Sequence, residues 1–116
     1  MDLIRAIGTK LGYKVEISSM GFDALIPALN SGNIDVAIAG MSITDERKKV
    51  VVFSDPYYTS GLIVMVKKDD DTIKGFSDLE GKRIAVQIGT TGANKAGEVK
   101  NAKVTAFNDN TAAAME

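Results

Sequence analysis

Short apolar runs of strand-forming residues alternate with helical patterns along the chain, and this alternation limits the fold more than any other feature of the sequence. Tyr13, Val15 and Ile17 alternate with polar residues, which predicts a half-buried strand. Ile34–Ala39 is an apolar run broken only by Asp35, as expected of a strand covered on both faces. Further strands are predicted at Val50–Phe53, Leu62–Val66, Arg83–Ile88 and Lys103–Phe107. Because helical segments separate the strands, we expect an α/β protein with a largely parallel sheet.

Helix signals fill the intervals between these strands. The spacing of Leu3, Ile4, Ile7 and Leu11 predicts a first helix, which Gly12 is expected to end. A second helix is predicted from near Asp23 to about Gly32, beginning early enough to place Pro27 near its first turn, where a missing N–H is tolerated. Three more helical segments are expected: a single turn at Ser77–Glu80, a polar helix to about Lys100, and an alanine-rich helix capped by Asp109 or Asn110. The chain begins and ends inside predicted helices, so we expect a fragment of a longer fold.

Composition narrows the possible functions. The chain has 116 residues, 45% of them hydrophobic, which suits one modest core. Fourteen basic and 15 acidic residues leave a net charge of −1, and no segment is strongly basic, which argues against a nucleic-acid partner. The absence of cysteine and histidine removes disulfides, thiol catalysis and the commonest metal ligand, so no cofactor or metal is expected. No apolar run approaches the ~20 residues of a membrane span, and no signal peptide is evident at the start.

A loop after the run Ile34–Ala39 has the chemistry of an anion receptor. Gly40, Met41 and Ser42 follow the carboxyl end of a predicted strand, where open α/β sheets bind ligands. Gly40 permits close approach to the backbone, and Ser42 offers a hydroxyl and an amide. Thr44 is a plausible N-cap for a short helix starting at Asp45. Arg47 follows within one turn, and its planar fork suits a carboxylate.

Less specific interpretations of these residues remain open. The charged run from Thr44 to Lys49 has the pattern of a capped, solvated surface turn, which is the commoner use of such runs. Phe22 opens a helix, where an aromatic residue more often belongs to the core than to a ligand platform. The turn Gly89-Thr90-Thr91-Gly92 is placed to hold an anion on backbone amides, but it lacks the lysine and spacing of a phosphate loop.

Three stretches carry a family resemblance that spacing alone would not reveal: FDALIPAL, GNIDVAIAGMSITDERKKVVVFSDPYY and GFSDLEGKRIAVQIGTTG, in that order. Together they closely resemble the extracellular solute-binding proteins of polar amino-acid ABC transporters, with the glutamine-binding branch nearest. The resemblance implies a periplasmic-binding-protein-like α/β fold of two lobes that close on an amino acid. Residues 1–67 would form most of lobe one and residues 68–116 about half of lobe two, truncated at both ends. A hinge is expected near Met65–Asp70.

The resemblance also assigns expected roles within the binding site. Arg47 matches the arginine that grips the ligand α-carboxylate, and Ser42 the hydroxyl residue beside it. Gly40, next to Met41, matches the residue whose carbonyl accepts from the α-ammonium group, and Phe22 matches the aromatic that packs over the ligand side chain. The second-lobe loop that approaches the carboxylate is matched by Thr90 and Thr91. Gln87 stands where glutamine binders of this branch often carry lysine, which leaves arginine, histidine or another polar amino acid open as the ligand.

The implied function is non-enzymatic delivery of a free amino acid to the membrane permease of an ABC importer, outside the cytoplasm, in the periplasm or on a lipid anchor. The family's first strand and its second-lobe partner for the α-ammonium have no counterpart in the chain. We therefore expect weak or absent ligand binding, and a homo-oligomer formed through unpaired sheet edges. Two alternatives are a periplasmic dehydratase-type enzyme on the same scaffold and the sensor domain of a receptor or histidine kinase. No carboxylate stands at a loop aimed at the expected cleft, as the enzyme would require.

Overall fold

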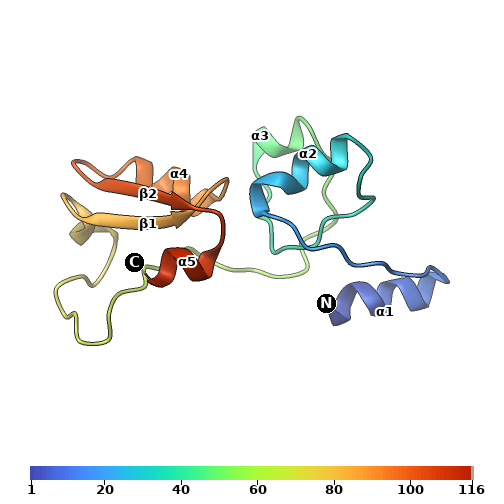
Figure 1. The fold of residues 1–116 in the computed structure, drawn as a ribbon, viewed down its shortest axis with the longest axis horizontal. Helices are drawn as coiled ribbons and strands as arrows, with labels where there is room; N and C mark the ends of the chain where they lie inside the picture. The colour runs from blue at the N-terminus through green and yellow to red at the C-terminus, as the bar shows by residue number, and fades with distance from the viewer. Residues whose placement is uncertain (116) are drawn as a thin grey trace.

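The computed structural model describes residues 1–115 and shows an elongated molecule built from two parts (Figure 1). One part contains the paired strands with the helices beside them, and the other contains the short helices that follow the N-terminal helix, which extends from it. The radius of gyration is 16.8 Å, whereas a compact domain of this length would have about 13 Å. In chain order the elements are α1 (Asp2–Leu11), η1 (Phe22–Ala24), α2 (Leu25–Asn30), α3 (Asp45–Lys48), η2 (Phe76–Leu79), β1 (Arg83–Gln87), α4 (Thr91–Gly97), β2 (Lys103–Phe107) and α5 (Asn110–Met115).

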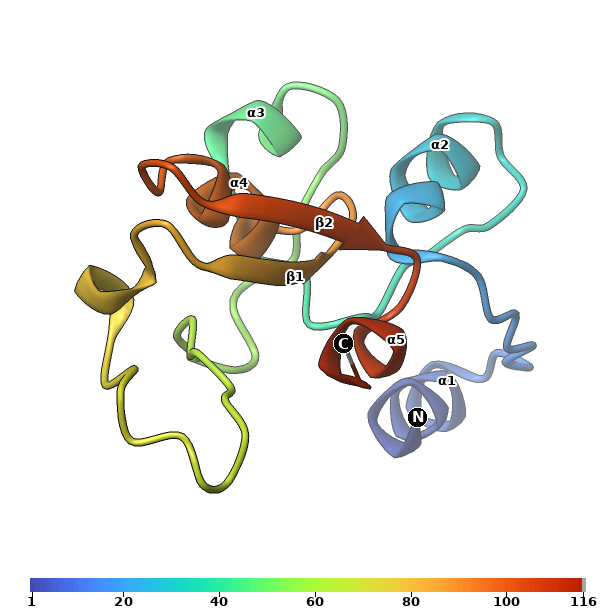
Figure 2. The same ribbon diagram turned by 60° about the vertical axis from the view of Figure 1, so that its left-hand side comes forward.

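The C-terminal part is a βαβ unit. Strand β1 pairs with β2 in parallel, from Arg83 opposite Lys103 to Gln87 opposite Phe107, and α4 provides the crossover. Helices α4 and α5 lie on opposite sides of the strand pair (Figures 1 and 2). Ala96 of α4 is only 4% exposed, so the helix buries its small face against the sheet. The predicted α/β class is confirmed, and both strands lie where the sequence placed them.

Helix boundaries follow the local signals closely. Gly12 ends α1 with φ 75°, a left-handed conformation that glycine adopts without a Cβ clash. Pro27 is the third residue of α2, within the first turn as expected. Asp109 accepts a hydrogen bond from the Ala112 amide at 2.8 Å and so caps α5. The predicted turn near Ser77 is a 3₁₀ helix, η2. Glu116, with which the predicted second lobe ends, lies outside the described residues.

Four predicted strands are wrong as assigned. The runs Tyr13–Ile17, Ile34–Ala39, Val50–Phe53 and Leu62–Val66 form no β-ladder among the described residues. The expected burial of Ile34–Ala39 on both faces is also wrong, because the Val36 side chain is 64% exposed. The physical reason is that a strand needs neighbouring backbone to supply N–H and C=O partners. Apolar periodicity reports which faces favour burial, and it does not reveal whether such a neighbour is present.

Few side chains of the described residues are enclosed. Leu79 and Ala96 form the buried hydrophobic core. Larger apolar side chains on the N-terminal side remain exposed, including Tyr13 at 72% and Leu11 at 62%. The buried core among the described residues therefore lies in the C-terminal part, at η2 and α4. The N-terminal part presents apolar surface instead.

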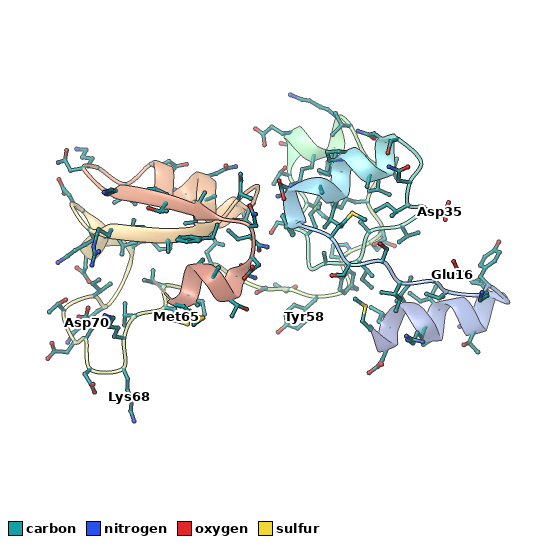
Figure 3. All side chains as sticks on the ribbon, in the orientation of Figure 1. Glu16, Asp35, Tyr58, Met65, Lys68 and Asp70 are labelled. Carbon is teal, nitrogen blue, oxygen red and sulfur yellow. The ribbon has the colours of Figure 1, made fainter. Side chains whose placement is uncertain are left out.

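One connection joins the two parts. Tyr58 lies on it between them, while Met65, Lys68 and Asp70 lie on the side of the strand pair (Figure 3). The predicted lobe boundary after residue 67 and the hinge near Met65–Asp70 stay predictions. Among residues 1–115, no helix has the length and apolar character required to cross a membrane.

Candidate functional site

The charged turn folds into α3 as its local sequence predicts. Thr44 adopts an extended conformation and its hydroxyl accepts from the Arg47 amide at 3.3 Å. This is the N-cap interaction, which satisfies an amide that the short helix leaves free. Arg47 lies in the last turn of α3. The residue that the motif singled out therefore has its backbone amide held by a cap three residues earlier.

Arg47 joins three segments that are distant in sequence. Its Nη1 donates to the Ser42 carbonyl at 2.7 Å, and its Nη2 donates to the Gly89 carbonyl at 2.9 Å. The guanidinium carbon lies 5.5 Å from the centroid of the Phe22 ring, within the range of a cation–π contact. Phe22, Ser42 and Arg47 of the predicted site thus lie together. They meet the turn that follows β1.

The other charges of the turn behave differently. Lys48 lies 3.7 Å from Asp45 in a pair three residues apart, and both side chains are largely exposed. Such surface pairs contribute little to stability. The surface-turn interpretation therefore describes Lys48 and Asp45 well. It does not describe Arg47, which is half-buried and held by two backbone carbonyls.

The loop between the apolar run 34–39 and α3 is hydrogen-bonded to Tyr57, near the other end of the same motif. Gly40 has φ 60°, and its amide donates to the Tyr57 hydroxyl at 3.1 Å. Met41 is half-buried, whereas Ser42 is exposed. Tyr57 was not among the residues singled out from the sequence, although it belongs to the Ser-Asp-Pro-Tyr-Tyr end of the same motif. Its hydroxyl holds the Gly40 amide.

Gln87, Thr90 and Thr91 surround the turn that follows β1. The Thr90 hydroxyl donates to the Gln87 carbonyl at 2.8 Å and accepts from the Ala93 amide at 3.1 Å. It is therefore the N-cap of α4 and is already engaged in the fold. Thr91 is the first residue of α4. The Gln87 amide nitrogen donates to the Asn108 carbonyl at 3.2 Å, which ties the end of β1 to the chain after β2.

Gly89 and Asp23, which are not among the predicted site residues, also lie where the segments around Arg47 meet. Gly89 has φ 76°, and a Cβ placed on it would lie 3.1 Å from the Asp23 Cβ and 3.2 Å from the Asp23 Cα. The turn after β1 therefore packs on η1, next to Phe22. The only sequence signal for this contact was the position of Gly89 at the end of a strand. Nothing in the sequence indicated Asp23 as its neighbour.

Two hollows of the surface are lined by residues outside the predicted site. One of about 370 Å³ is lined by Ile43, Lys48, Val51, Val52, Phe53 and Ser54. Another of about 300 Å³ is lined by Arg5, Thr9, Tyr13 and Val15. Neither is lined by Arg47. The candidate site is thus a junction of three segments, with an arginine fork at its centre.

Comparison with known proteins connects this chain to a family. The model of the bacterial extracellular solute-binding proteins, family 3, matches residues 1–116. A "Probable histidine-binding protein" of Campylobacter jejuni is 44% identical over 108 residues, covering 93% of this chain and 42% of the relative. The "Arginine-binding extracellular protein ArtP" of Bacillus subtilis is 41% identical over 99 residues, covering 85% of this chain and 38% of the relative.

Solved structures agree with these relatives. Holo ArgBP from T. maritima superposes with a TM-score of 0.94 at 48% identity, covering 99% of this chain and 51% of that one. An ancestral arginine-binding protein bound to glutamine superposes with a TM-score of 0.88 at 50% identity, covering 99% of this chain and 52% of that one. The chain thus spans about half the length of the proteins it matches.

These likenesses confirm the periplasmic-binding-protein-like fold and favour binding over catalysis. The relatives just described are binding proteins rather than enzymes. One further likeness bears on the dehydratase alternative, namely an ancestral amino acid-binding protein described as a precursor of cyclohexadienyl dehydratase, with a TM-score of 0.93 at 47% identity. That protein is itself described as a binder. On the family match and these identities, the chain belongs to the bacterial extracellular solute-binding proteins, family 3.

Proposed function

We propose that this chain contributes to binding an α-amino acid with a polar or basic side chain, for delivery to an ABC importer. The observation that carries the proposal is the position of Arg47 between the Ser42 and Gly89 carbonyls, beside the Phe22 ring. A guanidinium has five N–H donors, of which these contacts use two. The remaining donors suit a carboxylate, and both parts of the molecule contribute atoms around them.

The surrounding residues would take complementary roles. Ser42 would donate to the carboxylate beside Arg47, and the Gly40 carbonyl, next to Met41, would accept from the α-ammonium group. Phe22 would pack against the ligand side chain. In the second part, the amides of Thr90 and Thr91 would approach the carboxylate, since the Thr90 hydroxyl is engaged as a cap. Gln87 would help to define the ligand's far end.

The identity of the side chain is proposed from the relatives. Those named above are described as histidine- and arginine-binding proteins, and an ancestral arginine-binding protein has glutamine bound. We therefore propose glutamine or a basic relative such as arginine or histidine. A long polar side chain with hydrogen-bonding groups at its end is common to glutamine and arginine, and the Gln87 amide is able to serve either as donor or as acceptor.

We further propose how the binding would be used. Residues 1–67 and 68–116 would belong to two lobes that close about a hinge near Met65–Asp70, and the ligand would favour the closed state by contacting both. The closed protein would then present the amino acid to the membrane permease of the importer. The family is extracellular, so we place this function outside the cytoplasm, in the periplasm or on a lipid anchor.

A homo-oligomer is proposed on a separate observation. The runs 13–17 and 34–39 are without ladder partners among the described residues, and apolar side chains on them are exposed. Unpaired strand edges of this kind favour pairing with another chain. A second copy that supplies a strand would satisfy their backbone groups.

The test is an NMR titration of the isotope-labelled chain with arginine, histidine, glutamine and leucine. We expect saturable amide shifts for a polar or basic amino acid, centred on residues 40–42 and 89–92. We expect a dissociation constant of about 1 mM or weaker, because the set of contacts to the ligand is incomplete. A dissociation constant of about 1 mM corresponds to about 4 kcal/mol of binding free energy. Arg47→Ala should abolish these shifts, since it removes the fork that receives the carboxylate.

Lys49→Ala provides the matched control, since it removes an exposed positive charge two residues away and should leave the titration unchanged. Shifts that persist in Arg47→Ala would refute the carboxylate assignment. Micromolar affinity would refute the expectation of weak binding, and a response to leucine alone would refute the polar ligand class.

A further inference from the structure

At Gly89 the backbone of the C-terminal part packs closely on the N-terminal part. A Cβ at this position would lie 3.1 Å from the Cβ and 3.2 Å from the Cα of Asp23. Both distances are shorter than an ordinary contact between carbon atoms, which is about 3.5–4.0 Å. The atoms met belong to the main chain of η1 or adjoin it, so they are unable to move aside as the end of a flexible side chain would.

The same residue supplies a hydrogen-bond acceptor across the junction. The Gly89 carbonyl accepts from Arg47 Nη2 at 2.9 Å, while Arg47 Nη1 is held by the Ser42 carbonyl at 2.7 Å. Arg47 also lies over the Phe22 ring, which immediately precedes Asp23. Gly89 therefore contacts two elements of the N-terminal part, η1 by close packing and α3 by a hydrogen bond.

We propose that Gly89 and Arg47 form a docking latch that seats the turn after β1 on η1 and α3. The absence of a side chain at position 89 permits the approach, and the Arg47 guanidinium holds it. This inference goes beyond the proposed function, because it concerns the contacts of the two parts with each other and not with an amino acid. It predicts that the size of residue 89 controls the separation of the two parts.

The absence of cysteine makes a direct distance measurement possible. Spin labels are attached to cysteines introduced at two exposed positions, Lys49 after α3 and Lys103 at the start of β2. Pulsed electron–electron double resonance then measures the distance between the two labels. Without added amino acid, we expect one narrow distance distribution. Gly89→Ala should shift it to longer distances and broaden it, since the added Cβ would lie closer to the Asp23 Cβ and Cα than ordinary contacts allow and would force that backbone away.

Gly81→Ala is the matched control. Gly81 has φ 72°, close to the φ 76° of Gly89, but an added Cβ would meet nothing within 4 Å. Both substitutions thus introduce the same left-handed strain, and only one introduces the clash. Equal shifts in Gly81→Ala and Gly89→Ala, or no shift in Gly89→Ala, would overturn the proposal.

Gly89→Asn keeps the test decisive if Gly89→Ala fails to fold, because asparagine tolerates positive φ better than alanine does while still adding a Cβ. It should separate the parts with an unchanged circular dichroism spectrum. Arg47→Lys should also broaden the distribution, since an ammonium has no planar fork with which to hold two carbonyls. Distances unchanged in both variants would reject the latch. Because no amino acid is present, failure of ligand binding would leave this result unaffected.

Discussion

Arg47 and Lys48 are neighbours in sequence with different surroundings. Arg47 is half-buried and donates to two carbonyls, whereas Lys48 pairs loosely with Asp45 at the surface. Both belong to α3, a helix of only four residues that Thr44 caps, and helix geometry sends adjacent side chains in different directions. The partners available to each of these two side chains therefore depend on which side of the helical turn it occupies.

Asp70 shows how local hydrogen bonds alter an exposed carboxylate. The Thr72 hydroxyl donates to its Oδ1 at 2.6 Å and the Thr72 amide donates to the same oxygen at 2.8 Å. These bonds lower the pKa of Asp70 below its ordinary value of 3.8, the hydroxyl bond being the largest cause. Because the folded pKa is lowered, the carboxylate's contribution to stability is present above the ordinary value and is lost as pH falls through the lowered pKa.

We predict that Thr72→Val raises the pKa of Asp70 toward its ordinary value, since it removes the hydroxyl donor and leaves the amide bond. The measurement is an NMR pH titration of the Asp70 carboxyl carbon. Thr105→Val, on the exposed side of β2, serves as the control and should leave that pKa unchanged. A pKa that does not respond to Thr72→Val would contradict the assigned cause.

At the scale of elements, α1 is held against the chain that follows it by a glycine. Gly8 is buried, its carbonyl accepts from the Tyr13 amide at 2.8 Å, and a Cβ on it would clash with the Val15 side chain and lie 3.1 Å from the Tyr13 carbonyl oxygen. The helix thus returns directly onto the extended segment that leaves it. The left-handed Gly12 makes this return possible.

We predict that Gly8→Ala destabilises the chain by about 1–3 kcal/mol, because the overpacking outweighs the better helix propensity of alanine. Gly97→Ala, at the end of α4 where an added Cβ meets nothing within 4 Å, should instead be neutral or stabilising by about 0.5–1 kcal/mol. Urea unfolding followed by circular dichroism measures both. Val15→Ala should partly restore the stability of Gly8→Ala, and its failure to do so would show that the Tyr13 carbonyl dominates.

At the scale of the whole molecule, the two parts differ in completeness. The C-terminal part has a parallel strand pair between two helices, whereas the N-terminal part has extended segments without ladders and exposed apolar side chains. The chain spans 42% of its Campylobacter jejuni relative and 51% of T. maritima ArgBP. The extended segments of the N-terminal part thus have no ladder partners among residues 1–115.

We predict concentration-dependent self-association, measured by size-exclusion chromatography with light scattering. The double variant Tyr13→Lys with Val36→Lys should reduce it, because charges on strand edges oppose pairing. Tyr58→Lys is the control, since Tyr58 is 79% exposed but lies on the connection between the parts. A wild-type chain that stays monomeric at every concentration would contradict the prediction.

The sequence by itself determined the local elements of this protein. Gly12 ends α1, Thr44 caps α3, Asp109 caps α5, and β2 occupies the predicted residues. These features depend on φ preferences and on hydrogen bonds between residues a few positions apart, so the residues involved are sufficient to specify them. The quoted motifs likewise identified the family, because a resemblance over the whole chain does not require knowledge of the contacts.

Only the tertiary structure decided which of these elements meet. Ile34–Ala39 has the composition of a strand, yet pairing requires a neighbour that no local pattern reveals. Arg47 looked equally suited to solvent until its fork was found on the carbonyls of Ser42 and Gly89. The contact of Gly89 with Asp23 joins residues separated by most of the chain. Such contacts depend on how distant segments pack, and that packing decided where the candidate site lies.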